Sequence, residues 1–277
     1  MEFRRAKFLV AAAAASIVMS AATGQAAKVE VIAHRGFSYV APENTLVAMR
    51  EAYKTGADGV ELDIHLTADR KVILSHDETT SRTTGGTSMV IAETSASALQ
   101  KLDVGSWKNA KFAGEKMPLL EEMLAELPKG VRAFVEFKSG GDGAVEVRDV
   151  VEKSGKRGQV TFISFGLDTI TEVKRTMPDR PAYWLRGTEK DKETGKVIPH
   201  GPELIRQAKE RGLDGLDLNY GGITAEFVKE AKAAGLEVHA WTVNNADEAA
   251  RLRDIGVDSI TTDRPDMVLE VVRGKKQ

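Results

Sequence analysis

The chain is organised around Gly59-Val-Glu-Leu-Asp-Ile-His-Leu-Thr-Ala-Asp-Arg-Lys-Val-Ile-Leu-Ser-His-Asp77, a strand that carries acids, turns, and returns with a histidine. In an extended strand, successive side chains face opposite sides. Glu61, Asp63 and His65 therefore share one face, while apolar residues occupy the other. Taken alone, this stretch fits two interpretations, an exposed hairpin with an acidic outer face and one side of a functional site.

The turn of this hairpin predicts which residues of its two arms meet. Turn-forming residues occupy 67–70, and 71–74 is again strand-like. If the turn is centred between Asp69 and Arg70, His76 lies opposite Asp63. Together with Glu61, these residues would combine two carboxylates for a hard cation with an imidazole for proton transfer.

Composition indicates a globular protein without sulfur chemistry. The 277 residues are 42% hydrophobic and 29% charged, which suits a chain able to bury a full core. The absence of cysteine excludes a disulfide framework, a thiolate metal site and a cysteine nucleophile.

The N-terminus has the pattern of a secretory signal peptide. Three basic residues, Arg4, Arg5 and Lys7, precede an apolar run over 8–22 and small residues at 24–27. We expect residues 1–26 to be removed, which leaves one domain over 27–277 in the periplasm or the medium, without stable membrane insertion. An uncleaved anchor is the alternative. Removal of three basic residues and one acidic residue changes the formal charge from −2 to about −4, and no basic region suggests nucleic-acid binding.

Beyond the signal, short β-branched runs alternate with amphipathic helical patterns, which is typical of βα units around a parallel sheet. Besides 59–66, the predicted strands are 29–33, 131–137, 160–165, 182–185, 215–218, 237–241 and 259–262, and the helices are 45–55, 118–127, 143–153, 168–176, 203–211, 224–234 and 246–255. Eight such strands in about 250 residues predict a (β/α)8 TIM barrel. An open doubly wound sheet is the alternative, but no glycine-rich loop follows the first strand.

Two segments do not fit the repeat. Residues 78–117 are rich in Thr, Ser and Gly, with a short helical pattern near 97–102, and residues 186–200 are charged. Both follow strand ends. Because loops after barrel strands form the catalytic face, we expect both segments to supply walls or lids of a site.

Ionisable residues stand at the carboxyl ends of several predicted strands, where a barrel places its chemistry. The segments concerned are His34-Arg35-Gly36, Glu61-Leu-Asp63, Glu136-Phe-Lys138 and Trp241-Thr-Val-Asn244. Several such residues at one end of consecutive strands indicate a common site more strongly than a lone histidine would.

At this point the chain resembles the glycerophosphodiester phosphodiesterase family. The resemblance rests on His34-Arg-Gly, Pro42-Glu-Asn-Thr45, Glu61-Leu-Asp63, Thr67-Ala-Asp-Arg-Lys-Val-Ile-Leu-Ser-His76-Asp77, Glu136-Phe-Lys138, Trp241-Thr-Val-Asn244 and Gly256-Val-Asp-Ser-Ile-Thr-Thr-Asp-Arg-Pro265, in that order. Residues 82–107 also resemble the small insertion that these enzymes carry after the second unit.

The resemblance implies a metal-dependent hydrolase that releases sn-glycerol 3-phosphate and an alcohol from a small-molecule glycerophosphodiester. Matched residue by residue, it implies metal ligands at Glu61, Asp63 and Glu136 and a general acid/base pair at His34 and His76. The chemistry of the other residues adds substrate contacts at Arg35, Lys138 and Trp241. An all-carboxylate set suits one Mg²⁺ or Ca²⁺ better than Zn²⁺.

Several alternatives stay open on the sequence. Arg35 and Lys138 could instead form salt bridges with the acids at the barrel mouth, and Trp241 could pack in the core. The nucleophile is water or the substrate's own glycerol hydroxyl. A phospholipase D-like or phosphoinositide phosphodiesterase on the same scaffold, and a non-catalytic glycerophosphodiester-binding protein, are the competing functions. The sequence does not specify an oligomeric state.

Overall fold

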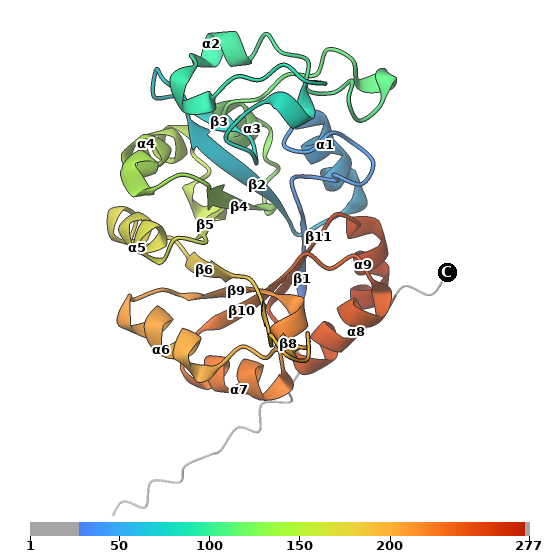
Figure 1. The fold of residues 1–277 in the computed structure, drawn as a ribbon, viewed down its shortest axis with the longest axis vertical. Helices are drawn as coiled ribbons and strands as arrows, with labels where there is room; N and C mark the ends of the chain where they lie inside the picture. Colours follow the sequence, from blue (N-terminus) through green and yellow to red (C-terminus); the bar gives the residue numbers. More distant parts are fainter. Residues whose placement is uncertain (1–27, 275–277) are drawn as a thin grey trace, which may run out of the picture.

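Within residues 28–274, which a computed structural model describes, eight parallel strands follow one another around a closed barrel (Figure 1). In order around the barrel they are β1 (Glu30–Ala33), β2 (Gly59–Leu66), β4 (Arg132–Phe137), β5 (Val160–Ser164), β6 (Ala182–Arg186), β9 (Gly215–Asn219), β10 (Glu237–Trp241) and β11 (Ser259–Thr262). β1 pairs with both β2 and β11, which closes the ring. The predicted (β/α)8 TIM barrel is confirmed.

Helices surround this ring and bury its outer face. They are α1 (Leu46–Thr55), α3 (Leu120–Glu126), α4 (Ala144–Ser154), α5 (Leu167–Thr176), α6 (Pro202–Glu210), α7 (Ala225–Ala233), α8 (Ala246–Ile255) and α9 (Pro265–Arg273), while α2 (Ala96–Leu99) belongs to the extra segment 78–117. The predicted barrel strands and the helices between them begin and end within two residues of these bounds, whereas α2 is shorter than the pattern at 97–102 and α9 is an addition. The predicted signal segment, 1–26, lies outside the described residues.

The two faces of β2 show why this strand alternates. Val60, Leu62 and Ile64 are fully or nearly buried in the layer between barrel and helices. Their alternate neighbours, Glu61 and Asp63, therefore point into the barrel. The alternation in the sequence thus separates residues that face the helices from acids that face the interior of the barrel.

A packed layer fills the barrel below the site. The ring of Tyr183 stacks on His239 at a centroid distance of 4.1 Å, and Phe134 packs edge-on against the same imidazole. Glu237 accepts hydrogen bonds from the Tyr183 hydroxyl, at 2.5 Å, and from His239 Nε2, at 3.2 Å. This layer occupies the amino-terminal part of the barrel and leaves the carboxyl ends of the strands for the site.

The hairpin after β2 forms as predicted, but its register is wrong by one residue. β3 (Val72–Leu74) runs antiparallel to β2 and pairs Ile64 with Leu74. Ser75, rather than His76, therefore faces Asp63, and its N–H donates to the Asp63 carbonyl at 3.1 Å. The reason lies in the turn, because Arg70 adopts a left-handed conformation, φ 54°, and closes a three-residue loop centred on Asp69.

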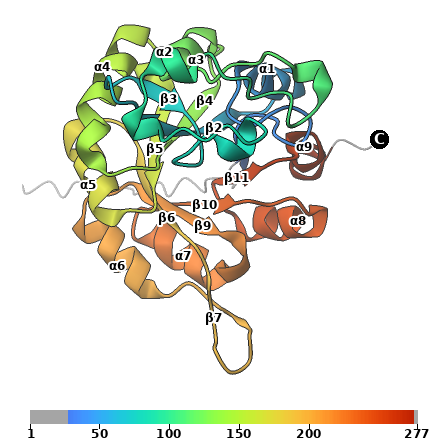
Figure 2. The same ribbon diagram turned by 45° about the horizontal axis from the view of Figure 1, so that its top comes forward.

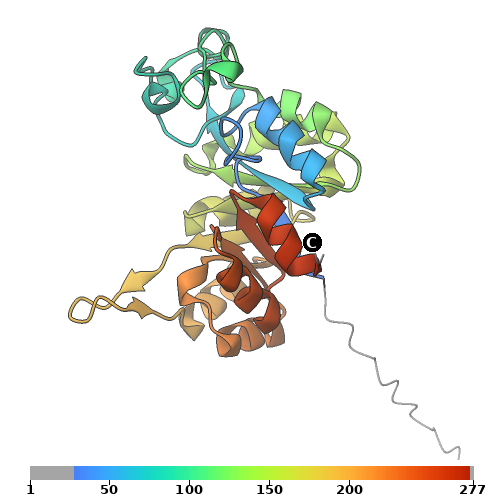
Figure 3. The same ribbon diagram turned by 90° about the vertical axis from the view of Figure 1, so that its right-hand side faces the viewer.

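The two extra segments form separate structures. Residues 78–117 pack on β3 around a small core of Ile73, Ile91, Leu99, Val104 and Met117, and form the upper part of the molecule in Figures 1 and 3. Residues 186–200 contain a two-stranded arm, β7 (Glu189–Lys190) and β8 (Val197–Ile198), which projects from the barrel in Figure 2. Among the described residues, no helix is long and apolar enough to cross a membrane.

Candidate active site

A cavity of about 130 Å³ opens at the carboxyl ends of the barrel strands. It is lined by His34, Arg35, Glu61, His76, Glu136, Lys138, Ile163, Phe165, Leu185, Asp217, Trp241, Thr242 and Thr261. All of the predicted site residues except Asp63, which is completely buried, belong to this lining. Neither residues 78–117 nor residues 186–200 contribute to this lining, so the expected walls are wrong, and residues 186–200 line a different cavity.

Three carboxylates gather at one side of the cavity. Glu61, Asp63 and Glu136 each offer an oxygen within 4.8 Å of the others, and all three side chains are buried. Asp63 and Glu136 are register partners on β2 and β4, which explains their proximity. Glu61 Oε1 and Asp63 Oδ1 have no hydrogen-bond partner among the described residues. These free oxygens and the all-oxygen donor set fit a hard divalent cation.

The electrostatics of the cluster also favour a cation. Burial, followed by the charges of Asp63 and Glu136, raises the pKa of Glu61 well above its ordinary value. Burial and Asp63 raise the pKa of Glu136 to about 7. Ionising all three acids is therefore unfavourable without a positive charge beside them, which a bound cation would supply.

The two predicted phosphate contacts, Arg35 and Lys138, line the cavity beside the acids. Arg35 Nε is 3.2 Å from Asp63 Oδ2, and Lys138 Nζ is 2.8 Å from Glu136 Oε1 and 3.6 Å from Asp63 Oδ1. Burial opposes ionisation of Asp63, but Arg35 and Lys138 overcome this effect and lower its pKa. Both basic side chains thus pair with acids and still line the cavity.

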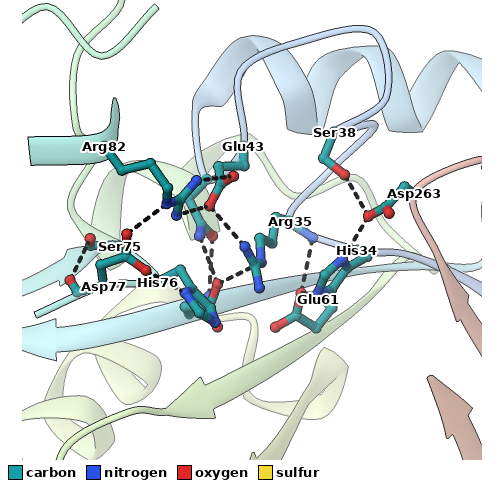
Figure 4. Close-up of polar contacts among 12 residues, drawn as sticks. His34, Arg35, Ser38, Glu43, Glu61, Ser75, His76, Asp77, Arg82 and Asp263 are labelled. Atoms are coloured by element: carbon teal, nitrogen blue, oxygen red, sulfur yellow. Dashed lines mark hydrogen bonds and ion pairs between the residues drawn. The ribbon is translucent and has the colours of Figure 1, made fainter. Parts of the chain in front are cut away.

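His34 is held by the last strand of the barrel. Its Nδ1 lies 2.6 Å from Asp263 Oδ1, and Asp263 also accepts hydrogen bonds from Ser38 Oγ and Asn244 Nδ2, as Figure 4 shows in part. His34 Nε2 is 3.9 Å from Glu61 Oε2. The imidazole therefore turns Nδ1 to its carboxylate partner and Nε2 to the acids at the cavity.

His76 has a similar arrangement on the opposite side. Its Nδ1 lies 2.7 Å from Asp77 Oδ1, and its charge contributes to lowering the pKa of the nearby Asp63. The one-residue shift of the hairpin therefore leaves the predicted cluster intact. His65 contacts only the back of this segment, with Nε2 3.4 Å from the His76 carbonyl, and lies outside the cavity lining.

Arg82 of the extra segment joins the two sides of the site. Its guanidinium donates to Asp77 Oδ2 at 2.6 Å and to both oxygens of Glu43 at 2.8 Å. Glu43 in turn accepts a hydrogen bond from Arg35 at 2.9 Å. A continuous chain of polar contacts therefore connects His76 to Arg35 (Figure 4). This is how the segment 78–117 contributes to the site.

The backbone conformation of the loop after β1 places an N–H group against Glu61. Arg35 and Gly36 both have positive φ, 54° and 80°, and the Arg35 N–H donates to Glu61 Oε2 at 2.9 Å. A side chain at Gly36 would come within 2.6 Å of the Ala48 carbonyl carbon, so only glycine lets the loop approach α1. The His34-Arg-Gly motif thus combines a histidine with a turn that fixes Glu61.

Several residues of the site were not predicted as functional. Asn44 clamps Asp63 by two hydrogen bonds, 2.8 Å to Oδ2 and 3.1 Å from the Asp63 N–H, while Thr45 caps α1. Asp263 lies directly after a predicted strand, and this position was a signal for a site residue. Asn44 and Arg82 lie in stretches that carry the family resemblance, but their roles could not be read from it, because their partners depend on the folded loops.

Trp241 both packs against neighbouring residues and lines the cavity, and its contact with substrate stays a prediction. Its indole N–H donates to the Asp217 carbonyl at 3.1 Å, and its ring packs edge-on against Phe165 at 5.5 Å. It also lines the cavity and gives it an apolar wall. The site therefore places charged and apolar surfaces opposite each other.

Fold and site together define a TIM-barrel protein with carboxylates and two imidazoles at the mouth of the barrel, an arrangement suited to acid–base chemistry on an anion. The model of the glycerophosphoryl diester phosphodiesterase family matches residues 34–267, and the chain belongs to this family. The resemblance inferred from the motifs is thereby confirmed.

Relatives in several organisms agree with this placement. The chain is 34% identical over 251 residues to a glycerophosphodiester phosphodiesterase of Caldanaerobacter subterraneus, covering 89% of this chain and 98% of that protein. It is 31% identical to one of Bacillus subtilis, covering 89% and 87%. A solved phosphodiesterase of Oleispira antarctica, in complex with the product sn-glycerol-3-phosphate, is 26% identical with a TM-score of 0.79 and covers 89% and 97%.

Proposed function

We propose that this protein hydrolyses small glycerophosphodiesters to sn-glycerol 3-phosphate and an alcohol. The observation that carries the proposal is the cavity that brings together His34, His76 and three buried carboxylates. The family membership and the product named for the Oleispira antarctica structure support the same substrate class.

Glu61, Asp63 and Glu136 would hold one Mg²⁺ or Ca²⁺. Such a cation supplies electrostatic stabilisation of the negative charge that develops on the phosphoryl oxygens. Arg35 and Lys138 line the same cavity and add fixed positive charge for binding and orienting the phosphodiester. The acids would thus hold the cation, and the cation and the two basic side chains would together bind the anionic substrate.

The two histidines divide the proton transfers. His34 Nε2 accepts the proton of the attacking hydroxyl, of water or of the substrate's glycerol, as the new P–O bond forms. If the glycerol hydroxyl attacks, a cyclic phosphate forms first, and attack by water then breaks its new P–O bond and gives glycerol 3-phosphate. His76 donates a proton to the leaving alkoxide as the old P–O bond breaks. Asp263 and Asp77 each engage Nδ1 of their histidine, which leaves Nε2 for this transfer.

The test is hydrolysis of glycerophosphocholine and glycerophosphoethanolamine by the protein without residues 1–26, with product identification. We expect release of glycerol 3-phosphate that stops with EDTA and returns with Mg²⁺ or Ca²⁺. His34→Ala and His76→Ala each abolish turnover, whereas His200→Ala, a matched change in the separate cavity beside β8, keeps it.

Three outcomes would contradict the proposal. Binding without release of glycerol 3-phosphate under either metal would make this a binding protein. Preferential cleavage of intact phospholipid would assign a different substrate class. Full activity of either alanine variant would remove that histidine from the mechanism.

We propose in addition that the protein is exported to the periplasm or the medium. The basic, apolar and small-residue pattern of positions 1–27 supports this location. Fractionation of cells that express the full chain, with mass determination of the product, tests it. A cell-associated cytoplasmic protein that retains residues 1–26 would refute export.

A further inference from the structure

One carboxyl group in the cavity has no role in the mechanism above. Asp217 on β9 is 1% exposed and lines the cavity, yet its Oδ1 has no hydrogen-bond partner among the described residues. It is not one of the three acids, Glu61, Asp63 and Glu136, whose oxygens lie within 4.8 Å of one another. Buried polar groups are nearly always hydrogen-bonded, so an unpaired one calls for a partner that arrives with a ligand.

The surroundings of Asp217 restrict what that partner is. Leu185 on β6 is the register partner of Asp217, and the indole N–H of Trp241 donates to the Asp217 carbonyl. Both residues line the cavity, as does the apolar Ile163. Thr261, on the adjoining side of the barrel, also carries a buried hydroxyl without a partner. The cavity lining on β9 and β11 therefore includes two buried polar atoms without a partner among the described residues, on strands separated by β10.

A ligand hydroxyl group matches this environment better than a phosphoryl oxygen does. A hydroxyl donates to a carboxylate and accepts from a carboxylic acid, so it pairs with Asp217 in either protonation state. A phosphoryl oxygen carries no proton, so it pairs with Asp217 only when the carboxyl group is protonated and is repelled by the carboxylate form. Burial, with a contribution from Glu136, also raises the pKa of Asp217 to about 8, and the match to a hydroxyl does not depend on this shift.

We infer that Asp217 is the specificity-determining residue that hydrogen-bonds a hydroxyl of the glycerol moiety, with Thr261 beside the same group and Trp241 against its carbons. The inference rests on the proposed function for its substrate class and deepens it. It separates the cavity into a phosphoryl side, with Arg35 and Lys138, and a polyol side on β9, β10 and β11.

Calorimetric binding of sn-glycerol 3-phosphate and of inorganic phosphate, both in saturating Mg²⁺, tests this division without requiring turnover. In Asp217→Leu we expect the affinity for glycerol 3-phosphate to fall about tenfold or more, because a paired buried hydroxyl is lost. The affinity for inorganic phosphate should stay within about twofold of the wild type. Asp217→Asn, which keeps a hydrogen-bonding side chain, should retain most of the preference.

Two controls keep the result interpretable. Asp168→Leu removes a carboxylate that is 90% exposed on α5 and should change neither affinity. The melting temperature of Asp217→Leu should equal or exceed that of the wild type, because an unpaired polar group leaves the interior. A folded Asp217→Leu protein with wild-type affinity for glycerol 3-phosphate would overturn the inference.

The remaining outcomes separate this inference from the proposed function. An equal loss of affinity for both ligands, or weaker Mg²⁺ binding by Asp217→Leu, would assign Asp217 to the phosphoryl or metal side and overturn the inference. A wild type that fails to bind glycerol 3-phosphate would overturn it as well. A wild type that binds glycerol 3-phosphate with the expected dependence on Asp217, but cleaves no diester, would uphold the inference and refute the enzyme.

Discussion

His34 and Asp263 are joined by a hydrogen bond of 2.6 Å between Nδ1 and Oδ1, although 229 residues separate them in the chain. They meet because β1 and β11 are neighbours in the closed barrel. Burial opposes ionisation of Asp263, but its hydrogen bond with His34 prevails and lowers the pKa of the carboxyl to about 2. Asp263 is therefore ionised at neutral pH and fixes the proton of His34 on Nδ1.

Asp263→Asn should lower kcat about a hundredfold, because general acid–base catalysis by the histidine depends on the correct tautomer. An amide at this position can donate to Nδ1 and move the imidazole proton to Nε2, where it blocks acceptance of a proton. The measurement is the pH profile of kcat, whose acidic limb should shift. Asp266→Asn, a neighbour paired with Arg264, serves as the control. An unchanged profile for Asp263→Asn would refute the role.

Arg82→Ala should lower kcat about tenfold or more. The change removes the hydrogen bonds to Asp77, which holds His76, and to Glu43, which holds Arg35. Arg82→Lys should restore only part of the rate, because a lysine cannot present the planar fork that reaches both Asp77 and Glu43. Steady-state kinetics on one glycerophosphodiester measures both effects. Arg175→Ala, which removes an exposed pair with Glu172, should have no effect. Wild-type kcat in Arg82→Ala would show that these contacts are dispensable.

Divalent cation should stabilise the folded protein, because binding relieves repulsion among buried carboxylates. At a concentration one hundred times its Kd, the gain in the free energy of unfolding is about 2.7 kcal/mol. Thermal melting with EDTA and with added Mg²⁺ or Ca²⁺ measures the difference. Glu61→Gln should weaken the response, while the exposed Glu121→Gln should keep it. A melting temperature indifferent to both cations would contradict the metal site.

Glu237 should make the barrel sensitive to acid. Its hydrogen bond with His239, with help from Tyr183 and against the effect of burial, lowers the pKa of Glu237 to about 2. A carboxyl with a depressed folded-state pKa stabilises the fold above its unfolded pKa, about 4.3, and this contribution is lost as the pH falls towards 2. Glu237→Gln should therefore be less stable than the wild type at pH 6.

The difference in melting temperature between the wild type and Glu237→Gln should shrink steadily from pH 5 to pH 2, the window set by the two pKa values. Glu226→Gln, an exposed change on α7, controls for the loss of one negative charge. A constant difference across that range would mean that the carboxylate does not carry the stabilisation.

The sequence allowed the barrel and most of the site to be predicted, because both follow from local patterns. Alternation on β2 placed Glu61 and Asp63 on one face, and the carboxyl ends of parallel strands brought Glu136 to them. The register of the hairpin failed by one residue because it depends on the positive φ of Arg70, a non-glycine residue in a conformation that composition does not reveal.

Other features required the folded chain. The arm formed by β7 and β8 lies in a charged segment without alternation, and the link from Arg82 to Glu43 joins loops 39 residues apart. Asp217 could not be predicted as a site residue for a different reason. A single acid within an apolar strand reads as an ordinary position until the absence of a partner for its Oδ1 is seen.

The pairing of β1 with β11 also orders the appearance of activity during synthesis. A ribosome adds Asp263 to the chain 229 residues after His34, so over that interval a growing chain carries its first imidazole without the carboxylate that orients it. A nascent or truncated chain that stops before β11 holds the acids and both histidines but no closed ring. The site is therefore complete only after the chain has been synthesised through residue 263 and β11 has paired with β1.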